Sequence, residues 1–352
     1  MSVSAIDAGT VAASPVLEVR NLAVRFRTRH MTIAAVEGVN FDLREGETLA
    51  LVGESGAGKS MTALAVMRLV QSEYGQSSVE VEGEVLFREG SASRVNLCAL
   101  GKEDMRRIRG RAMSMVFQEP MTALNPLMRV GEQIAEAILV HERVGAKVAR
   151  ELAIDMLHRV SIPDPRARHR AYPHELSGGM RQRIVIAMAL ACRPRLLIAD
   201  EPTTALDVTV QAQVLALVRS LQRELGMAVL FITHDLGIVA QMADRVAVMY
   251  AGRIVEQAPI DVLFAQPHHP YTAALFQAMP NAARRASEWL PAAVHDAATV
   301  RVHEPGGCAF RARCPCAGPR CRDAMPPLEE LGAQRLVRCW YPRAALSPAA
   351  TG

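Results

Sequence analysis

The sequence predicts an α/β protein whose core is a mainly parallel β-sheet, accompanied by an antiparallel β-layer. Four short, continuous apolar runs indicate buried strands, because a strand that is apolar on both faces needs cover on both sides. Helix-like segments separate these runs, and this alternation is typical of α/β domains. The four runs are TLALV (48–52), RLLIAD (195–200), AVLFIT (228–233) and RVAVMY (245–250).

The antiparallel layer is predicted from the chain that follows Pro15. Two runs, LEVRNLAVRF (17–26) and VEGVNFDL (36–43), alternate apolar and polar residues as half-buried strands do. The preceding residues are small and polar, so we expect residues 1–14 to form a flexible tail. No run approaches the roughly 20 apolar residues of a membrane-spanning helix, and the N-terminus lacks the features of a signal peptide. We therefore expect a cytosolic protein.

The overall composition does not point to a nucleic-acid partner. Forty Lys and Arg against 36 Asp and Glu give a formal net charge of +4, which is too small an excess to indicate nucleic-acid binding. The 352 residues leave room for one large domain and a smaller one. Seven cysteines are present, and most of them lie near the C-terminus. In a cytosolic protein this crowding favours metal or redox chemistry over disulfides.

The strongest chemical motif is GESGAGKS at 53–60, which lies between the predicted strand TLALV and a helix-like run. Gly53 and Gly58 let the backbone wrap a phosphate chain, Lys59 reaches the outer phosphates, and Ser60 holds Mg²⁺. The motif therefore predicts a phosphate-binding loop at the beginning of a helix. The expected contacts are Gly53, Glu54, Ser55, Gly56, Ala57, Gly58, Lys59, Ser60, Met61 and Thr62.

An acidic pair follows another predicted buried strand, in LLIADEP. Asp200 is placed to hold Mg²⁺, directly or through water, and Glu201 to polarise an attacking water. An isolated Asp-Glu pair at this position would more simply be a helix cap. Its combination with the phosphate-binding motif favours a catalytic role.

A third motif, HELSGGMRQ (174–182), places two glycines at the beginning of a long apolar helix. Together, GESGAGKS, LLIADEP and LSGGM resemble the signature of ABC-type ATPases, whose usual LSGGQ ends here in Met180. The resemblance implies that Ser177 and the amides of Gly178 and Gly179 bind the γ-phosphate of a nucleotide held by the opposite subunit. Met180 departs from the usual glutamine, but the implied phosphate contacts come from Ser177 and the glycine backbone.

The same resemblance assigns roles to four further residues. Gln118 in VFQEP matches the Q-loop, which contacts Mg²⁺ and the attacking water. Asp207 in TTALD matches the D-loop at the dimer seam, and His234 in FITHD matches the switch histidine that contacts the γ-phosphate. Phe26 falls where family members place the aromatic residue that stacks on adenine, although aromatic residues in strands usually just pack.

The resemblance also implies a domain organisation. Residues 15–262 are expected to form the ABC ATP-binding domain, with a helical subdomain at about 119–185. The segment PHHPYTAALFQAMP (267–280) resembles the one that marks the oligopeptide, dipeptide and nickel importer ATPases. We therefore expect residues 263–352 to form the C-terminal extension of that branch.

Four cysteines of this extension match the C-terminal cysteine pattern of dipeptide-type subunits. The resemblance implies a four-iron four-sulfur cluster, whereas the spacing alone fits a structural Zn²⁺ equally well. Free thiols on a flexible tail are the third alternative. The predicted ligands are Cys308, Cys314, Cys321 and Cys339, with Cys316 outside the pattern, and Cys98 and Cys192 are expected to be buried small residues.

The resemblance implies an ATPase subunit that works at the cytoplasmic face of the inner membrane. The expected partners are a second, similar ATPase subunit, two transmembrane permease chains and an extracytoplasmic solute-binding protein. Peptides are the expected cargo, with nickel, glutathione or another small solute as the alternative.

Two other classes of protein are the alternatives. An ABC ATPase of DNA repair or translation would normally carry a long coiled-coil insertion or two ATPase domains. The second alternative is a redox-sensing regulatory protein, which only the cysteines suggest.

Overall fold

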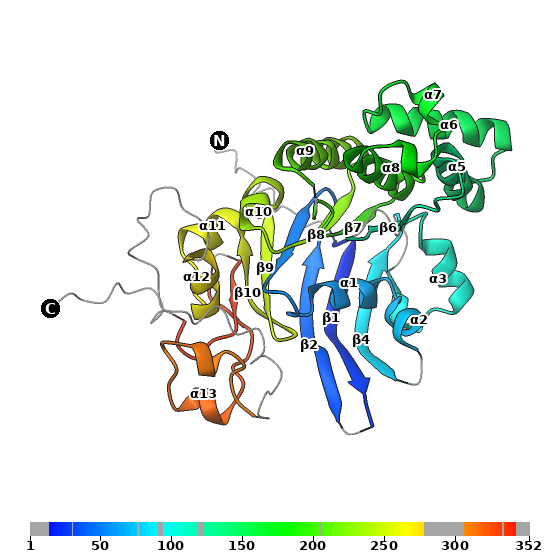
Figure 1. Ribbon diagram of the computed structural model, residues 1–352. Coiled ribbons are helices and arrows are strands. Elements are labelled where there is room, and N and C mark those ends of the chain that lie inside the picture. The colour runs from blue at the N-terminus through cyan, green and yellow to red at the C-terminus, as the bar shows by residue number, and fades with distance from the viewer. Residues whose placement is uncertain are drawn as a thin grey trace, which may run out of the picture.

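Two β-sheets with surrounding helices make up the structure, a computed structural model that describes residues 14–29, 31–75, 78–90, 94–118, 123–204, 206–277, 306–332 and 334–342 (Figure 1). The larger sheet has the strand order β11-β12-β10-β9-β3-β8-β7-β6. This architecture confirms the predicted α/β class. The strands are β3 (Thr48–Val52), β6 (Met113–Val116), β7 (Leu196–Asp200), β8 (Ala228–Thr233), β9 (Arg245–Tyr250), β10 (Arg253–Pro259), β11 (Glu329–Glu330) and β12 (Leu336–Val337).

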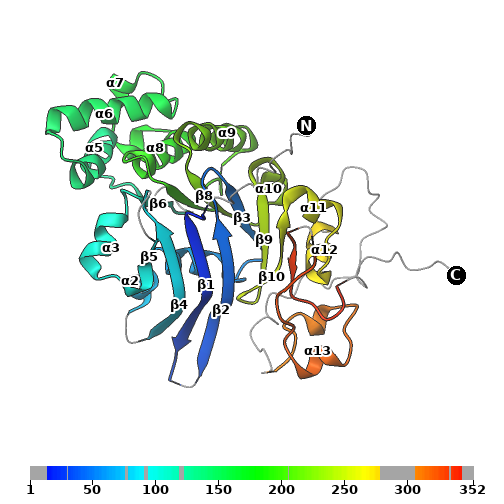
Figure 2. The ribbon, with the colours of Figure 1, turned by 180° about the vertical axis from the view of Figure 1, so that it is seen from behind.

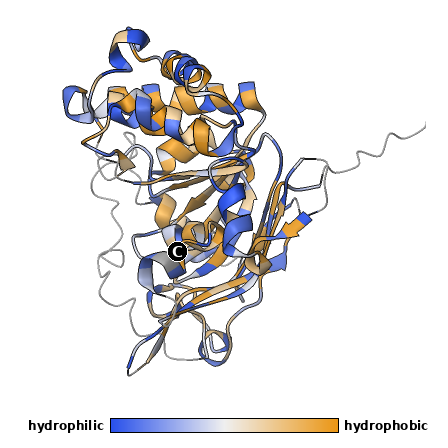
Figure 3. Cartoon of the chain, turned by 90° about the vertical axis from the view of Figure 1, so that its right-hand side faces the viewer, coloured by the Kyte–Doolittle hydropathy of each residue, from blue (hydrophilic) through white to orange (hydrophobic). Residues whose placement is uncertain are grey.

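The five strands from β9 to β6 are mutually parallel and form the centre of the large sheet. Every residue of β3, β7, β8 and β9 is buried, as their continuous apolar sequences predict. Strand β6 is not predictable from the sequence in the same way, because its four residues, MSMV, are too few to show a period. Figure 3 shows these central strands mainly in the colour of hydrophobic residues.

The antiparallel layer is a four-stranded sheet with the order β2-β1-β4-β5. Its inward side chains, such as Phe41 and Phe87, pack with Leu49 and Leu51 of β3 in one hydrophobic core. Its outer face carries cross-strand ion pairs, among them Arg25 with Glu82, at 2.6 Å. Figure 2 shows this layer face on. The strands are β1 (Leu17–Arg27), β2 (Thr32–Leu43), β4 (Val79–Arg88) and β5 (Arg94–Asn96).

Helices cover the large sheet and extend beyond it (Figure 1). A second hydrophobic core joins α5, α6, α8 and α9 to β7 and β8. The range predicted for the helical subdomain contains α5 to α7 and the first part of α8. Its first residues, 119–122, lie outside the described residues, as do residues 1–13 of the predicted tail. Within the described ranges, no helix combines the length and apolarity needed to cross a membrane. The α-helices are α1 (Lys59–Val66), α2 (Val70–Tyr74), α3 (Lys102–Ile108), α5 (Val130–His141), α6 (Ala146–Arg159), α7 (Pro165–Arg168), α8 (Gly178–Leu190), α9 (Val208–Leu225), α10 (Leu236–Met242), α11 (Ile260–Ala265), α12 (Pro270–Gln277) and α13 (Arg320–Asp323), with 3₁₀ turns η1 (Leu97–Ala99), η2 (Pro173–Glu175) and η5 (Arg311–Arg313).

The C-terminal segment 306–342 joins the large sheet. Its strand β12 pairs antiparallel with β10, so that Val337 lies opposite Glu256. The boundary expected near residue 262 lies inside α11, and residues 278–305 lie outside the described residues. The chain before this boundary and the chain after it therefore contribute strands to the same sheet.

Glu256 of β10 organises the junction between the sheet and the PHHPYT segment. Its carboxylate, which is fully buried, accepts hydrogen bonds from the backbone N–H groups of His268 and His269 at 2.8 and 2.9 Å. Arg335, from the chain just before β12, lies 3.9 Å from the same carboxylate. Burial raises the pKa of Glu256, and these donors oppose that rise. One carboxylate thus connects β10, the PHHPYT turn and the C-terminal segment.

Replacing this carboxylate should destabilise the protein strongly. We expect Glu256→Ala to lower the free energy of unfolding by about 3 to 5 kcal/mol, because two backbone donors lose their acceptor and the buried Arg335 loses the opposite charge beside it. Glu256→Gln, which keeps one carbonyl oxygen, should lose less. Denaturant unfolding followed by circular dichroism measures both. The control is Glu329→Ala on the exposed strand β11, and a Glu256→Ala protein as stable as this control would contradict the prediction.

Candidate active site

The predicted site residues meet at one edge of the large sheet, where the parallel strands end. β3 leads into the phosphate-binding loop, residues 53–60, which we call the P-loop. β7 ends at Asp200, β8 is followed by His234, and β6 is followed two residues later by Gln118. Because the carboxyl ends of parallel strands lie at the same edge, four loops that are distant in sequence come together there.

Two glycines of the P-loop are required by close contacts with neighbouring backbone. Gly53 has φ +156°, and a Cβ atom there would lie 2.2 Å from the carbonyl oxygen of Met249. Gly58 has φ +100°, and its Cβ would lie 2.5 Å from the carbonyl oxygen of Ala35. No other residue type fits at either position without a backbone shift. Sequence reasoning assigned these glycines to the phosphate, and the structure adds a packing requirement.

Lys59 lies at the beginning of α1 with its ammonium group inside the P-loop. Its Nζ donates hydrogen bonds to the carbonyl oxygens of Gly53 and Glu54, at 2.8 and 3.0 Å. Burial lowers the pKa of Lys59, while the carboxylates of Glu201 and Asp200 act in the opposite direction. The ammonium is therefore already held where a phosphate bound by the loop would need it. Of the remaining predicted contacts, Ala57 and Thr62 are buried, Met61 is half-buried, and Ser55, Gly56 and Ser60 are exposed.

The hydroxyl group of Ser60 and the carboxylate of Asp200 lie next to each other in the site. The Ser60 hydroxyl donates to the Asp200 carboxylate at 3.0 Å. Burial raises the pKa of Asp200, and the hydrogen bond from Ser60 and the charge of Lys59 oppose this rise. A hydroxyl beside a carboxylate is a set of hard oxygen donors, which is what Mg²⁺ prefers. The residues present therefore fit a magnesium ion.

Glu201 is held by three side chains. Its Oε2 atom accepts hydrogen bonds from Gln118 at 3.2 Å and from Thr204 at 3.0 Å, and its Oε1 atom lies 3.1 Å from Nδ1 of His234. Burial alone would raise the pKa of Glu201, but the hydrogen bonds from His234 and Thr204 outweigh it, so the pKa lies below its usual range. The carboxylate is thus kept ionised. Gln118, Glu201 and His234 come together as predicted, whereas Thr204, three residues after Glu201 in sequence, was missed.

The backbone of Glu201 is also unusual. Its φ of +46° lies in the left-handed region, which costs a non-glycine residue about 1 to 3 kcal/mol. Its N–H nevertheless donates to the carbonyl of Ile232 at 2.9 Å, which continues the pairing of β7 with β8. The sheet therefore fixes the direction in which this side chain leaves the strand.

The beginnings of α8 and α9 lie side by side. Ser177 caps α8 by accepting a hydrogen bond from the N–H of Met180 at 3.3 Å, and Asp207 caps α9 through Val210 at 2.9 Å. A Cβ atom on Gly179 would lie 2.5 Å from Val210 Cγ1, whereas one on Gly178 would meet nothing within 4 Å. Gly179 therefore permits the packing of the two helices, and the backbone at Gly178 faces open space.

Phe26 lies half-buried on β1, at one end of the antiparallel layer. Its ring makes an edge-to-face contact with Tyr74, with ring centroids 5.3 Å apart. This contact accounts for packing on one side of the ring. The stacking of adenine on Phe26 remains a prediction.

The cysteines of the C-terminal segment are unpaired thiols gathered in one region. Burial raises the pKa of Cys308 and raises the pKa values of Cys314 and Cys339 to about 12 and about 11. Cys308, Cys316 and Cys321 are near enough to Cys339 to raise its pKa further. Among the described residues, however, no group of three or more His, Cys, Asp or Glu side chains is arranged to hold a metal ion. The arrangement therefore gives no support to the predicted iron–sulfur or zinc centre, and Cys98 and Cys192 are half-buried, not fully buried as expected.

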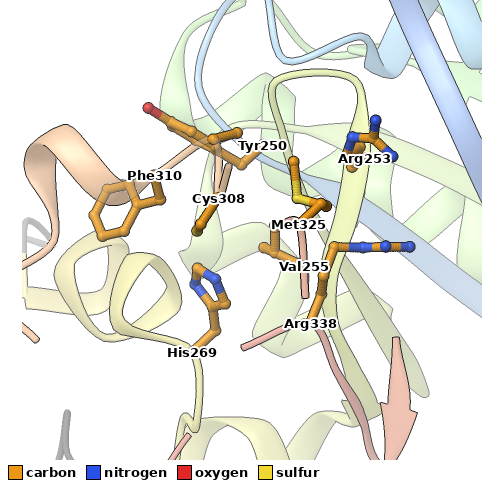
Figure 4. Close-up of a pocket in the computed structure, with 9 residues that line it drawn as sticks. Tyr250, Arg253, Val255, His269, Cys308, Phe310, Met325 and Arg338 are labelled. Atoms are coloured by element: carbon orange, nitrogen blue, oxygen red, sulfur yellow. The ribbon is translucent and has the colours of Figure 1, made fainter. Parts of the chain in front are cut away.

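A small cavity lies between the C-terminal segment and the large sheet (Figure 4). Its volume of about 10 Å³ has room for roughly one water molecule, so it cannot take a nucleotide. Cys308 and His269 face it from the two sides. Burial lowers the pKa of His269 to about 3, and its Nδ1 accepts a hydrogen bond from the N–H of Tyr271 at 3.0 Å. The cavity belongs to the packing of the segment.

Comparison with known proteins agrees with this geometry. Residues 36–204 match the ABC transporter family, and residues 255–321 match the C-terminal region of oligopeptide/dipeptide transporters. A protein of Brucella melitensis, provisionally named a peptide import ATP-binding protein, is 50% identical over 92% of this chain and 96% of its own length. The dipeptide transport ATP-binding protein of Bacillus subtilis is 48% identical over 92% and 94%.

Solved structures show the same fold. A dimeric ATP-binding cassette, determined in a post-hydrolysis state with ADP and phosphate, superimposes with a TM-score of 0.60. It is 26% identical and covers 69% of this chain and 98% of its own. The P-loop, the acidic pair and the matched regions lead to one conclusion: this chain belongs to the ABC transporter ATPases, in the branch that carries the oligopeptide/dipeptide transporter C-terminal region.

Proposed function

We propose that this chain binds ATP with Mg²⁺ at the carboxyl edge of its large sheet and that the hydrolysis of ATP powers the import of di- and oligopeptides. The observation that carries this proposal is the convergence of the P-loop, the Ser60–Asp200 pair and the ionised Glu201 at that edge. Each of these groups matches a requirement of phosphoryl transfer, which depends on positioning and charge stabilisation more than on covalent catalysis.

The chain's own residues divide the work of hydrolysis. The P-loop amides and Lys59 hold the phosphates. Ser60 and Asp200 would hold Mg²⁺, which would supply positive charge beside the phosphate oxygens. Glu201 accepts a proton from the water that attacks the γ-phosphorus. The bond between the γ-phosphorus and the oxygen that bridges it to the β-phosphorus breaks, which leaves ADP and phosphate. Gln118, Thr204 and His234 orient the Glu201 carboxylate toward that water.

A second ATPase subunit completes the site. Ser177 and Gly178 are exposed at the beginning of α8, and Gly178 faces open space, so this helix end is accessible to a phosphate from another chain. Asp207 lies at the neighbouring end of α9, where the dimer seam is expected. The related cassette was solved as a dimer with ADP and phosphate, which supports this arrangement. We propose a similar but distinct partner subunit.

The cargo and the other partners are inferred from relatives. The matched C-terminal region and the names of the similar proteins refer to peptide transport, which favours peptides over nickel or glutathione. We infer two permease chains in the inner membrane, an extracytoplasmic solute-binding protein, and a position for this chain on the cytoplasmic face. Ligand identification on the co-purified solute-binding protein tests the cargo.

Removing the proposed general base should stop turnover without preventing ATP binding. In Glu201→Gln the amide cannot accept the proton, and we expect single-turnover hydrolysis in the assembled transporter to fall by about 10² to 10³. Binding by Lys59, Ser60 and Asp200 should persist, so that ATP-bound dimers accumulate. Glu103→Gln, on the exposed face of α3, is the matched control. Near-normal turnover of Glu201→Gln would contradict the assignment of Glu201 as the general base.

A bulky residue at position 177 should damage a site on the other subunit. We expect Ser177→Arg to reduce ATP hydrolysis in the assembled transporter at least about tenfold, because the longer side chain fills the space in front of α8. ATP affinity of the isolated chain, measured by titration calorimetry, should be unchanged. Ser220→Arg on the exposed side of α9 is the control. Loss of ATP binding by the isolated Ser177→Arg chain would show that the residue acts within its own subunit.

We keep a C-terminal metal centre as a separate proposal that is supported by cysteine spacing alone. If Cys308, Cys314, Cys321 and Cys339 are its ligands, anaerobic purification should yield one centre per chain, which Cys308→Ser removes and Cys316→Ser retains. Iron with equivalent sulfide indicates a four-iron four-sulfur cluster, and zinc without sulfide indicates a structural Zn²⁺. A metal-free protein with a protease-resistant C-terminal segment would contradict the proposal.

A further inference from the structure

Glu54, the second residue of the P-loop, is held by the C-terminal part of the chain. Its backbone N–H donates to the hydroxyl oxygen of Tyr271 at 2.9 Å. Its carboxylate accepts two hydrogen bonds from the guanidinium group of Arg313, at 2.9 and 2.8 Å. Two parallel bonds between a guanidinium and a carboxylate are the strongest form of such a pair. Both partners lie within the matched C-terminal region, residues 255–321.

Arg313 is itself held on a rigid aromatic platform. Tyr250, Tyr271 and Phe310 are all buried, and their ring centroids lie 4.6 to 5.5 Å apart. The guanidinium carbon of Arg313 lies 5.8 Å from the ring centroid of Tyr250 and 5.7 Å from that of Phe310, a distance at which a cation is attracted to the ring faces. Figure 4 shows Tyr250 and Phe310 beside Cys308 of the C-terminal segment. The position of Arg313 is therefore fixed by packing.

The ion pair between Arg313 and Glu54 is shielded from solvent well enough to contribute to stability. The side chain of Arg313 is 17% exposed and that of Glu54 is 26% exposed. Exposed ion pairs contribute little because water screens them and long side chains lose entropy, but neither argument holds fully for a partly buried, bidentate pair. The hydrogen bonds to Glu54 raise the pKa of Arg313, and burial acts in the opposite direction. The guanidinium thus remains charged beside the carboxylate.

A free carboxylate at this position would oppose the function of the loop. The P-loop receives a polyanion, and a negative charge within a few ångströms of it costs binding free energy. Arg313 offsets that charge and holds the carboxylate on the side of the C-terminal segment. Glu54 also presents its backbone carbonyl to Lys59 Nζ at 3.0 Å, so its position affects the placement of the lysine that contacts the phosphates.

We propose that Arg313 is a positioning residue for ATP: it neutralises Glu54 and, together with Tyr271, holds the first turn of the P-loop in the conformation that receives the triphosphate. The C-terminal segment thereby sets the ATP affinity of its own chain. This inference rests on the proposed role of the P-loop as the phosphate cradle.

A double-mutant cycle on the full-length chain tests the proposal. We expect Arg313→Gln to raise the dissociation constant for MgATP, measured by titration calorimetry, about tenfold. In the Glu54→Gln background the same substitution should change it less than twofold, because no carboxylate remains to be neutralised. Arg313→Lys, which keeps the charge but loses the bidentate geometry, should restore part of the affinity. Tyr271→Phe, which loses only the hydroxyl acceptor, should weaken binding about threefold.

Kinetics of the assembled transporter separate positioning from a merely structural role. Arg313→Gln should raise KM for ATP about tenfold and change kcat at saturating ATP less than twofold, because Arg313 does not touch the reacting atoms. Arg322→Gln, on the exposed part of α13, should leave both constants unchanged. If Arg313→Gln lowers only the melting temperature, or if its effect on affinity is equal in both backgrounds, the proposal is wrong.

One further variant distinguishes failure of this inference from failure of the proposed function. Lys59→Ala should abolish MgATP binding if the P-loop is the phosphate cradle. Loss of binding in Lys59→Ala with normal binding in Arg313→Gln would overturn this inference alone. Normal binding in both variants would overturn the role of the P-loop, and this inference with it.

Discussion

The hydrogen-bonded register of β3, β8 and β7 is the constraint on which the site depends. Val52 at the end of β3 lies opposite Thr233, and Asp200 at the end of β7 lies opposite Ile232. The P-loop, His234 and Glu201 therefore leave the sheet within about one residue of the same level. A slip of one residue in any of these pairings would turn every side chain of that strand to the other face. Both faces of these strands are buried in close-packed cores, so a slip would force side chains of different size into each position and disrupt that packing. The hydrophobic core thereby helps to fix the geometry of the polar site.

Two adjacent carboxylates at this edge acquire opposite properties from their surroundings. Burial dominates at Asp200 and raises its pKa, whereas hydrogen bonds dominate at Glu201 and lower its pKa. The surroundings differ because Asp200 is still a buried residue of β7, whereas Glu201 follows the strand with φ +46°. A carboxyl group whose burial disfavours its charged form gains from a nearby cation, whereas an ionised carboxylate can accept a proton. The local backbone conformation thus gives the two carboxyl groups of one Asp-Glu dipeptide different surroundings.

The sequence was sufficient for those parts of the site that are encoded locally. The four apolar runs are strands, and the P-loop, Asp200, Glu201 and His234 follow them directly, so spacing and the rule that parallel strands share an edge predict where they meet. The contacts of Glu54 with Tyr271 and Arg313 bridge 217 and 259 residues, and no periodicity or turn signal connects such distant positions. Likewise, two-residue strands such as β12 have no pattern of their own and form because β10 presents an open edge.

The C-terminal segment is consequently part of the ATPase architecture in a physical sense. β12 pairs with β10, β10 with β9, and β9 with β3, whose end is the P-loop, so the segment is connected to the phosphate site through continuous backbone hydrogen bonds. A second route runs from the buried Glu256 through the PHHPYT turn to Tyr271 and the N–H of Glu54. Both routes start at β10, and they reach the P-loop at different points, one through the end of β3 and the other through the hydrogen bond of Glu54 with Tyr271. The PHHPYT motif therefore has a structural reason in this chain: it places the Tyr271 hydroxyl against the P-loop, where it accepts a hydrogen bond from the N–H of Glu54.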